Sequence, residues 1–157
     1  MTATETETAV RGSPMTIQQV ARLSGLSEPT LRYYEKIGLI PAVDRDRDSG
    51  HRRYHPRVVE TIKSLGCLRS TGMSVRDMRA YLSLLDEGAQ GAAPLRDLFH
   101  RNADRLEREI ALMEVRLRYL RLKADMWDAR DRADAGAERR AIDELTDVID
   151  ALWETQP

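Results

Sequence analysis

The chain has a single cysteine, Cys67, and few aromatic residues, which make up 5% of its 157 residues. One cysteine excludes an intrachain disulfide and a multi-cysteine metal cage. No apolar run reaches the length of a membrane-spanning helix, and residues 1–14 lack the apolar core of a signal peptide. These absences favour a cytoplasmic protein that contacts no membrane, and they predict neither a metal nor another cofactor.

Charge is plentiful but unevenly distributed along the chain. Residues 11–82 carry 13 Lys and Arg against 7 Asp and Glu, whereas residues 83–157 carry 12 against 17. A positive half before a negative half is typical of a polyanion-binding head on a body that does not bind, although chance unevenness gives the same counts. The Thr and Glu alternation near the start predicts a disordered arm over residues 1–14.

Two short helices joined by a tight turn are predicted after this arm. Thr16 is a candidate N-cap of the first helix, and Gly25 is expected to end it. Ser27 is expected to cap the second helix, with Pro29 in its first turn and Gly38 at its end. This pattern is typical of a helix-turn-helix. The first helix is expected to bury the face formed by Ile17, Val20, Ala21 and Leu23.

Residues 43–54 predict a two-stranded hairpin, the wing, with Ser49 and Gly50 near its turn. A third helix is expected to start at Pro56, and a fourth to follow the cap Ser74. These elements complete a predicted winged helix domain over residues 15–87. The fourth helix is expected to turn Val75, Met78, Tyr81, Leu82 and Leu85 inward.

Early positions of a recognition helix approach base edges, while basic and hydroxyl side chains contact phosphates. Side chains alternate across a strand, so we expect one of Arg52 and Arg53 to meet phosphate. The other is expected to pair with an acid such as Asp44 or Asp46. Tyr34 also suits the edge of the core. The predicted DNA-binding residues are Thr16, Ser27, Thr30, Arg32, Tyr33, Tyr34, Arg45, Arg47, His51, Arg52, Arg53 and Tyr54.

Residues 88–130 predict a loop, over residues 88–94, followed by one long helix. Its apolar residues recur at alternating steps of four and three, which is typical of a coiled-coil seam. A second copy of the chain is the simplest partner for this seam; an intramolecular hairpin with the tail helix, residues 131–157, is the alternative. The tail is a candidate effector region. The seam comprises Phe99, Ala103, Leu106, Ile110, Met113, Leu117, Leu120, Ala124 and Trp127.

The strings TLRYYE at 30–35, GLIP at 38–41 and SGHRRY at 49–54, with GMS at 72–74, closely resemble the MerR (mercury-resistance regulator) family. The resemblance implies a mainly α fold in which a winged helix-turn-helix precedes a long antiparallel coiled-coil helix. It also implies a homodimer that binds double-stranded promoter DNA sequence-specifically and distorts the promoter spacer for RNA polymerase. An effector-independent repressor or an architectural DNA-binding protein is the alternative.

The sequence departs from the family pattern in two ways. His51 stands where the family usually has Tyr, and residues 88–157 lack the cysteines of metal-sensing members. We therefore expect no metal site. Cys67 resembles in position the thiol of members that respond to electrophiles, and Lys63 and Arg69 are nearby cations. A lone cysteine is also commonly a small buried hydrophobe. No effector is identified, and no catalytic constellation stands out, so we predict that the chain is not an enzyme.

Overall fold

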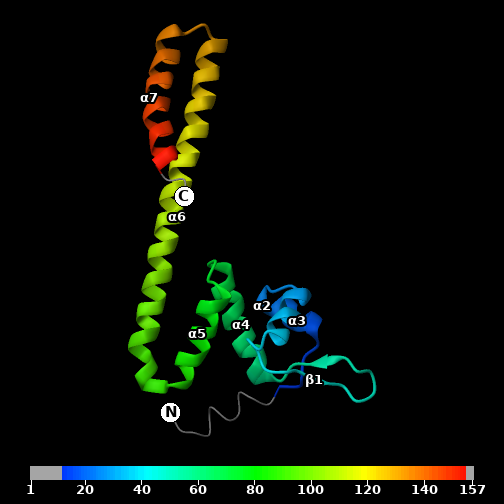
Figure 1. Ribbon diagram of the computed structural model, residues 1–157. Helices are drawn as coiled ribbons and strands as arrows, with labels where there is room; N and C mark the ends of the chain where they lie inside the picture. The colour runs from blue at the N-terminus through cyan, green and yellow to red at the C-terminus, as the bar shows by residue number, and fades with distance from the viewer. Residues whose placement is uncertain (1–11, 155–157) are drawn as a thin grey trace. The chain divides into compact units, whose positions relative to one another are not determined.

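The computed structural model describes residues 12–154. The predicted disordered arm lies outside the described residues, apart from residues 12–14. The elements in chain order are α2 (Ile17–Ser24), α3 (Glu28–Lys36), β1 (Asp44–Arg45), β2 (Arg52–Arg53), α4 (Pro56–Ser70), α5 (Val75–Asp86), the 3-10 helix η1 (Gly88–Gly91), α6 (Ala92–Asp131) and α7 (Ala135–Glu154) (Figure 1). The mainly α fold is confirmed. The chain forms two compact units, Met1–Leu98 and Phe99–Pro157.

The helix-turn-helix of the first unit begins with a reciprocal cap. The Thr16 hydroxyl accepts from the Gln19 amide at 3.3 Å, and the Thr16 amide donates to Gln19 Oε1 at 2.8 Å. Gly25 ends α2 with a φ of 71°, a left-handed conformation that glycine adopts without strain. Ser27 then caps α3, its hydroxyl accepting from the Thr30 amide at 3.2 Å. These predicted boundaries are confirmed because caps are local signals.

Leu23 was expected to face the core, and this expectation is wrong, because its side chain is 54% exposed. A helix turns about 100° per residue, so the face through Val20 and Ala21 continues at Ser24 rather than at Leu23. Leu85 on α5 is likewise 47% exposed rather than inward-facing. Both leucines fit the apolar spacing of their helix, but their angular position around the helix axis lies outside the buried face.

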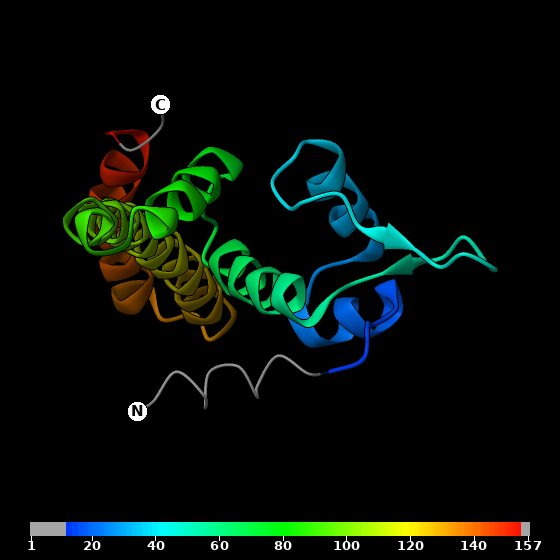
Figure 2. The ribbon, with the colours of Figure 1, turned by 90° about the horizontal axis from the view of Figure 1, so that it is seen from below.

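The predicted wing is a short antiparallel hairpin. Asp44 pairs with Arg53 and Arg45 with Arg52, and the hairpin projects from the helices of this unit (Figure 2). An isolated bridge extends it: Met15 and Tyr54 exchange two backbone hydrogen bonds of 2.9 and 2.8 Å. The segment before α2 therefore attaches directly to the base of the wing, a link that the sequence did not predict.

The core of the first unit lies between α2, α3, α4 and α5. Helices α2 and α4 come close together at Gly66, where a Cβ would lie 2.0 Å from the Ser24 carbonyl oxygen. The buried residues of this core are Val20, Leu26, Leu31, Tyr34, Leu39, Ile40, Tyr54, Val59, Ile62, Leu65, Met73 and Met78.

The predicted loop over residues 88–94 is shorter than expected. Gly88–Gly91 forms η1 and α6 begins at Ala92, so Pro94 lies in the first turn of α6. Proline is tolerated there because the first amides of a helix have no intrahelical partner.

In the second unit, α7 runs antiparallel to the end of α6 (Figure 1). Its tail residues pack on α6 through a small core of Leu122, Met126, Ala141, Leu145 and Val148. The predicted seam lies on another face of α6: Met113 and Leu122 are nine residues apart, which is about half a turn in angle at roughly 100° per residue. The hairpin alternative is therefore correct that the tail packs on α6, but wrong that the tail buries the seam.

Replacement of Gly66 by alanine should destabilise the first unit, because the added methyl group meets a backbone oxygen that cannot move away cheaply. Overpacking of this kind costs on the order of 1–3 kcal/mol. Urea denaturation measures the loss. The matched control is Gly136→Ala in α7, where a Cβ would have only side-chain neighbours at 3.5 and 3.6 Å. Equal stability of the Gly66→Ala variant and the parent would contradict the tight helix contact.

Candidate nucleic-acid interface

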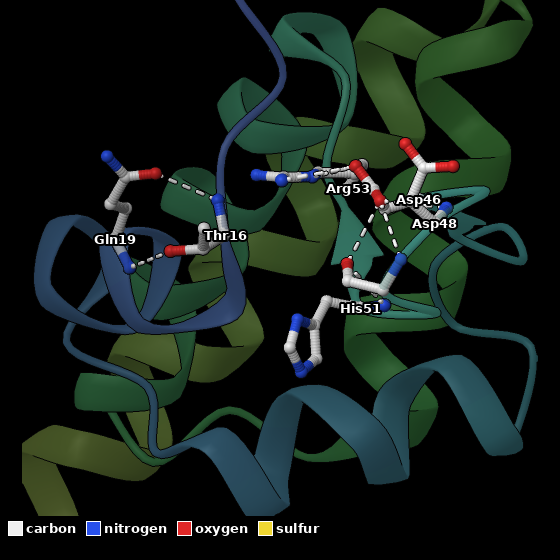
Figure 3. Close-up of polar contacts among 7 residues, drawn as sticks. Thr16, Gln19, Asp46, Asp48, His51 and Arg53 are labelled. Atoms are coloured by element: carbon white, nitrogen blue, oxygen red, sulfur yellow. Dashed lines mark hydrogen bonds and ion pairs between the residues drawn. The ribbon is translucent and has the colours of Figure 1, made fainter.

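A hollow of about 270 Å³ opens between the start of α2, helix α3 and the wing. Six predicted DNA-binding residues line it together. Figure 3 shows three residues of its lining, with Thr16 beside its capping partner, Arg53 beside Asp46, and His51 near the wing turn. The lining residues are Thr16, Ile17, Gln18, Arg32, Arg45, Gly50, His51, Arg52 and Arg53.

The charged side chains that line this hollow are all basic. Its lining includes four arginines and a histidine but no carboxylate. Ile17, Gln18 and Gly50 also line it, and sequence reasoning missed all three. The Thr16 cap is the signal that could have found Ile17 and Gln18, because amides in the first turn of a helix are free to bind an anion. The hollow is therefore suited chemically to the phosphates of a polyanion.

The other predicted contact residues do not line this hollow. Ser27 and Thr30 bond to each other through their hydroxyls at 2.8 Å. Tyr33 is 50% exposed on α3, and Arg47 is exposed in the turn of the wing. These four residues thus lie on the exposed sides of the two elements that flank the hollow.

Tyr34 and Tyr54 were predicted to contact DNA, but both side chains are buried in the core. Their side chains are 2% and 0% exposed, and their hydroxyl groups have no hydrogen-bond partner among the described residues. Burial raises the pKa of both hydroxyl groups. Tyr34 shares the buried face of α3 with Leu31, three residues earlier, so the core-edge interpretation of Tyr34 is correct.

Both adjacent arginines of β2 pair with acids, whereas one of them was expected to remain free. Arg52 Nε lies 2.7 Å from Glu35 Oε2. Arg53 donates to Asp46 Oδ2 from Nε at 3.3 Å and from Nη2 at 3.2 Å. The alternation of side chains was predicted correctly, but the acid on α3 that holds Arg52 was not foreseen because it is 17 residues away in the chain.

Asp46 organises the turn of the wing. The Ser49 amide and hydroxyl donate to its Oδ1 at 2.9 and 3.0 Å, and the Asp48 amide donates at 3.2 Å. These bonds, the Ser49 amide first, lower the pKa of the Asp46 carboxyl to about 2. The stabilisation from a lowered pKa is present above the unfolded value and is lost as pH falls through the folded one. The Asp46 carboxylate therefore stays ionised, and keeps these hydrogen bonds across the turn, at neutral and mildly acidic pH.

A long-range contact joins α5 to the end of α3. Arg79 Nη2 donates to the Ile37 carbonyl oxygen at 3.0 Å. A cation at a helix C-terminus interacts favourably with the helix dipole. Arg79 thus supports the position of α3 from the side opposite to its N-terminal cap.

Over residues 12–154, no group of three or more His, Cys, Asp or Glu side chains is placed to hold a metal ion. Within the same range no helix combines the length and the apolarity that crossing a membrane requires.

Known proteins resemble this chain in sequence. Residues 15–85 match the family described as MerR HTH family regulatory protein. An uncharacterized HTH-type transcriptional regulator of Haemophilus influenzae is 33% identical over 107 residues, which cover 68% of this chain and 76% of the relative. The HTH-type transcriptional regulator AdhR of Bacillus subtilis is 45% identical over 74 residues, which cover 47% of this chain and 52% of AdhR. Nodulation protein NolA of Bradyrhizobium elkanii is matched over 56% of its length, so this chain spans about half of each of the latter two.

Solved structures are similar as well. A putative MerR family transcriptional regulator from Listeria monocytogenes has a TM-score of 0.59 and 30% identity, covering 85% of this chain and 95% of that one. HiNmlR, a MerR family regulator lacking the sensor domain and crystallised with promoter DNA, has a TM-score of 0.64 and 27% identity, covering 82% and 95%. The winged helix-turn-helix and its cationic hollow define the class as DNA-binding transcription regulators. The chain belongs to the MerR family of these regulators.

Cys67 lies on α4 and is exposed, so the interpretation as a small buried hydrophobe is wrong. The reactive-thiol interpretation stays a prediction. Iodoacetamide is expected to alkylate Cys67 in the folded protein, and Cys67→Ser is expected to abolish any response of DNA binding to electrophiles. Peptide mapping by mass spectrometry measures the labelling, with unfolded protein as the full-labelling control. A folded protein that resists the reagent, with an unchanged DNA response in the variant, would refute a sensing role.

Proposed function

We propose that this chain binds promoter DNA as a homodimer and controls transcription by distorting the promoter spacer. The observation that carries the DNA-binding part is the cationic hollow between α2, α3 and the wing, with Arg32, Arg45 and His51 on its walls. In this arrangement α3 enters the major groove and the wing contacts the flanking phosphates. The similar structure of HiNmlR bound to promoter DNA supports the same partner for this chain.

Phosphate contacts make affinity fall with salt, with a slope of log K against log salt of about −0.9 per contact. Arg45→Gln and Arg47→Gln should each reduce that slope by about 1 and weaken binding to any DNA sequence. Fluorescence anisotropy from low to high salt measures this, on a fragment first mapped by footprinting of the chain's own upstream region. The control Arg139→Gln removes an exposed arginine of α7 and should leave the slope unchanged. A parent protein indifferent to duplex DNA at low salt would refute the proposal.

The homodimer part rests on the solvent-exposed middle of the α6 seam, from Leu106 to Leu120. A groove of about 330 Å³ along it is lined by Leu106, Glu109, Ile110, Met113, Glu114 and Leu117. Leu117, Met113 and Leu120 are 47%, 61% and 64% exposed in the single chain. Leucines at a and d spacing favour a second helix of the same kind, because its knobs fill such holes. We infer that the occupant is α6 of a second copy in antiparallel orientation.

Leu117→Glu places a charge in this seam and should convert the dimer to a monomer at micromolar concentration, since an unpaired charge in an apolar interface is costly. Sedimentation equilibrium measures the mass. Ala111→Glu is the matched control, because it adds the same charge to the same helix on an exposed face away from the seam. A parent protein that sediments as a single chain would contradict the dimer.

Spacer distortion follows from the family resemblance and has a separate test. Each surplus base pair rotates one promoter element by roughly 35° about the duplex, since B-DNA has about 10 base pairs per turn. Transcription in vitro from a long-spacer promoter should therefore require the protein, and shortening the spacer by the surplus should remove the requirement. Protein that only blocks polymerase on both promoters would instead support the alternative, an effector-independent repressor.

A further inference from the structure

Two oxygen atoms of one carboxylate connect the recognition helix to both sides of the wing. Glu35, near the end of α3, accepts from Arg52 Nε through Oε2 at 2.7 Å. Its other oxygen, Oε1, accepts from the Val43 amide at 3.4 Å. Val43 immediately precedes β1 and Arg52 belongs to β2. The Glu35 carboxylate is therefore attached to the base of the wing at each strand.

The pair is also largely shielded from solvent, with side-chain exposures of 21% for Arg52 and 16% for Glu35. Removing one partner of a shielded ion pair leaves the other charge uncompensated, which is strongly unfavourable. If Arg52 turned to a DNA phosphate, the Glu35 carboxylate would lose its counter-charge. Arg52 is therefore poorly suited to bind phosphate, although it lines the hollow.

Arg45 differs from Arg52 although the two are paired in register. Directly opposed residues of an antiparallel pair point to the same face, so both face the hollow. The Arg45 guanidinium bonds only the Gly50 carbonyl oxygen, at 3.2 Å, and no carboxylate among the described residues pairs with it. Its charge is available for an anion. One face of the wing thus carries Arg52, which is in an ion pair, and Arg45, which is not.

The wing needs such a support, because strands of two residues have too few ladder bonds to hold an orientation by themselves. We propose that Glu35 is a positioning residue for DNA recognition: its carboxylate fixes the wing relative to α3, with Arg52 as its internal counter-charge and not as a phosphate ligand. This inference rests on the proposed DNA-binding function. It assigns the phosphate contacts of the hollow to Arg45 and His51.

The test compares Arg52→Gln with Arg45→Gln on operator and on unrelated DNA over a range of salt concentrations. For a positioning pair, Arg52→Gln should weaken operator binding at least tenfold and bring it closer to non-specific binding, with the salt slope unchanged. Arg45→Gln should weaken both kinds of binding alike and reduce the slope by about 1. An Arg52→Gln slope that falls as for Arg45→Gln would overturn the proposal.

Removal of the acid, the charge of opposite sign in the pair, supplies a second readout. Glu35→Gln should weaken operator binding by about as much as Arg52→Gln, and the double variant should lose no more than either single one, because the pair acts as a unit. Glu60→Gln is the matched control: it removes the same charge from an exposed pair with Lys63 on α4, outside the hollow, and should leave operator binding unchanged. If Glu35→Gln strengthened binding as a released Arg52 would, the positioning role would be wrong.

A charge swap guards against variants that merely fail to fold. Glu35→Arg combined with Arg52→Glu keeps both charges and should recover at least part of the operator selectivity that the single variants lose. No recovery in a swap whose circular dichroism and melting match the parent would overturn the proposal. If the parent protein itself does not bind DNA, the proposed function fails; if the parent binds and Arg45→Gln alone behaves as expected, only the positioning role fails.

Discussion

A wing whose strands are two residues long needs support from outside its own ladder, and the contact between Glu35 and Arg52 joins it to α3. The backbone bridge between Met15 and Tyr54, and the hydrogen bonds that Asp46 accepts within the turn, restrain the wing further. Helix α3 is in turn fixed by its Ser27 cap at one end. The hollow depends on these restraints, since its walls come from three segments that do not otherwise form a continuous surface.

The second unit depends on a different constraint, which is that α6 carries two apolar faces. One face packs on α7 through Leu122 and Met126 and forms a core within the chain. The other face, with Met113 and Leu120, has no cover in the single chain. A helix with apolar residues on both sides needs two partners. The tail supplies one of them, and the proposed second copy supplies the other.

Local signals explain why much of the fold was predictable. A cap such as Thr16 or Ser27 acts within three residues, and a glycine such as Gly25 acts on its own backbone. The motifs that resemble the MerR family, such as TLRYYE at 30–35, are recognised from residue identity alone and need no knowledge of packing. Burial is different, because it depends on the direction in which a helix meets its neighbours. Leu23 and Leu85 were therefore assigned to the wrong side.

By itself, the sequence determined the order of the long helices, the caps at Thr16, Ser27 and Ser74, the place of the wing, the periodic seam and the resemblance to the MerR family. Only the tertiary structure decided which arginines of the wing are in ion pairs: Glu35 and Asp46 pair with Arg52 and Arg53, and no carboxylate among the described residues pairs with Arg45. Only the tertiary structure showed that the tail leaves the seam exposed. The reason is physical: caps and turns depend on neighbours in the chain, whereas charge pairing and burial depend on neighbours in space.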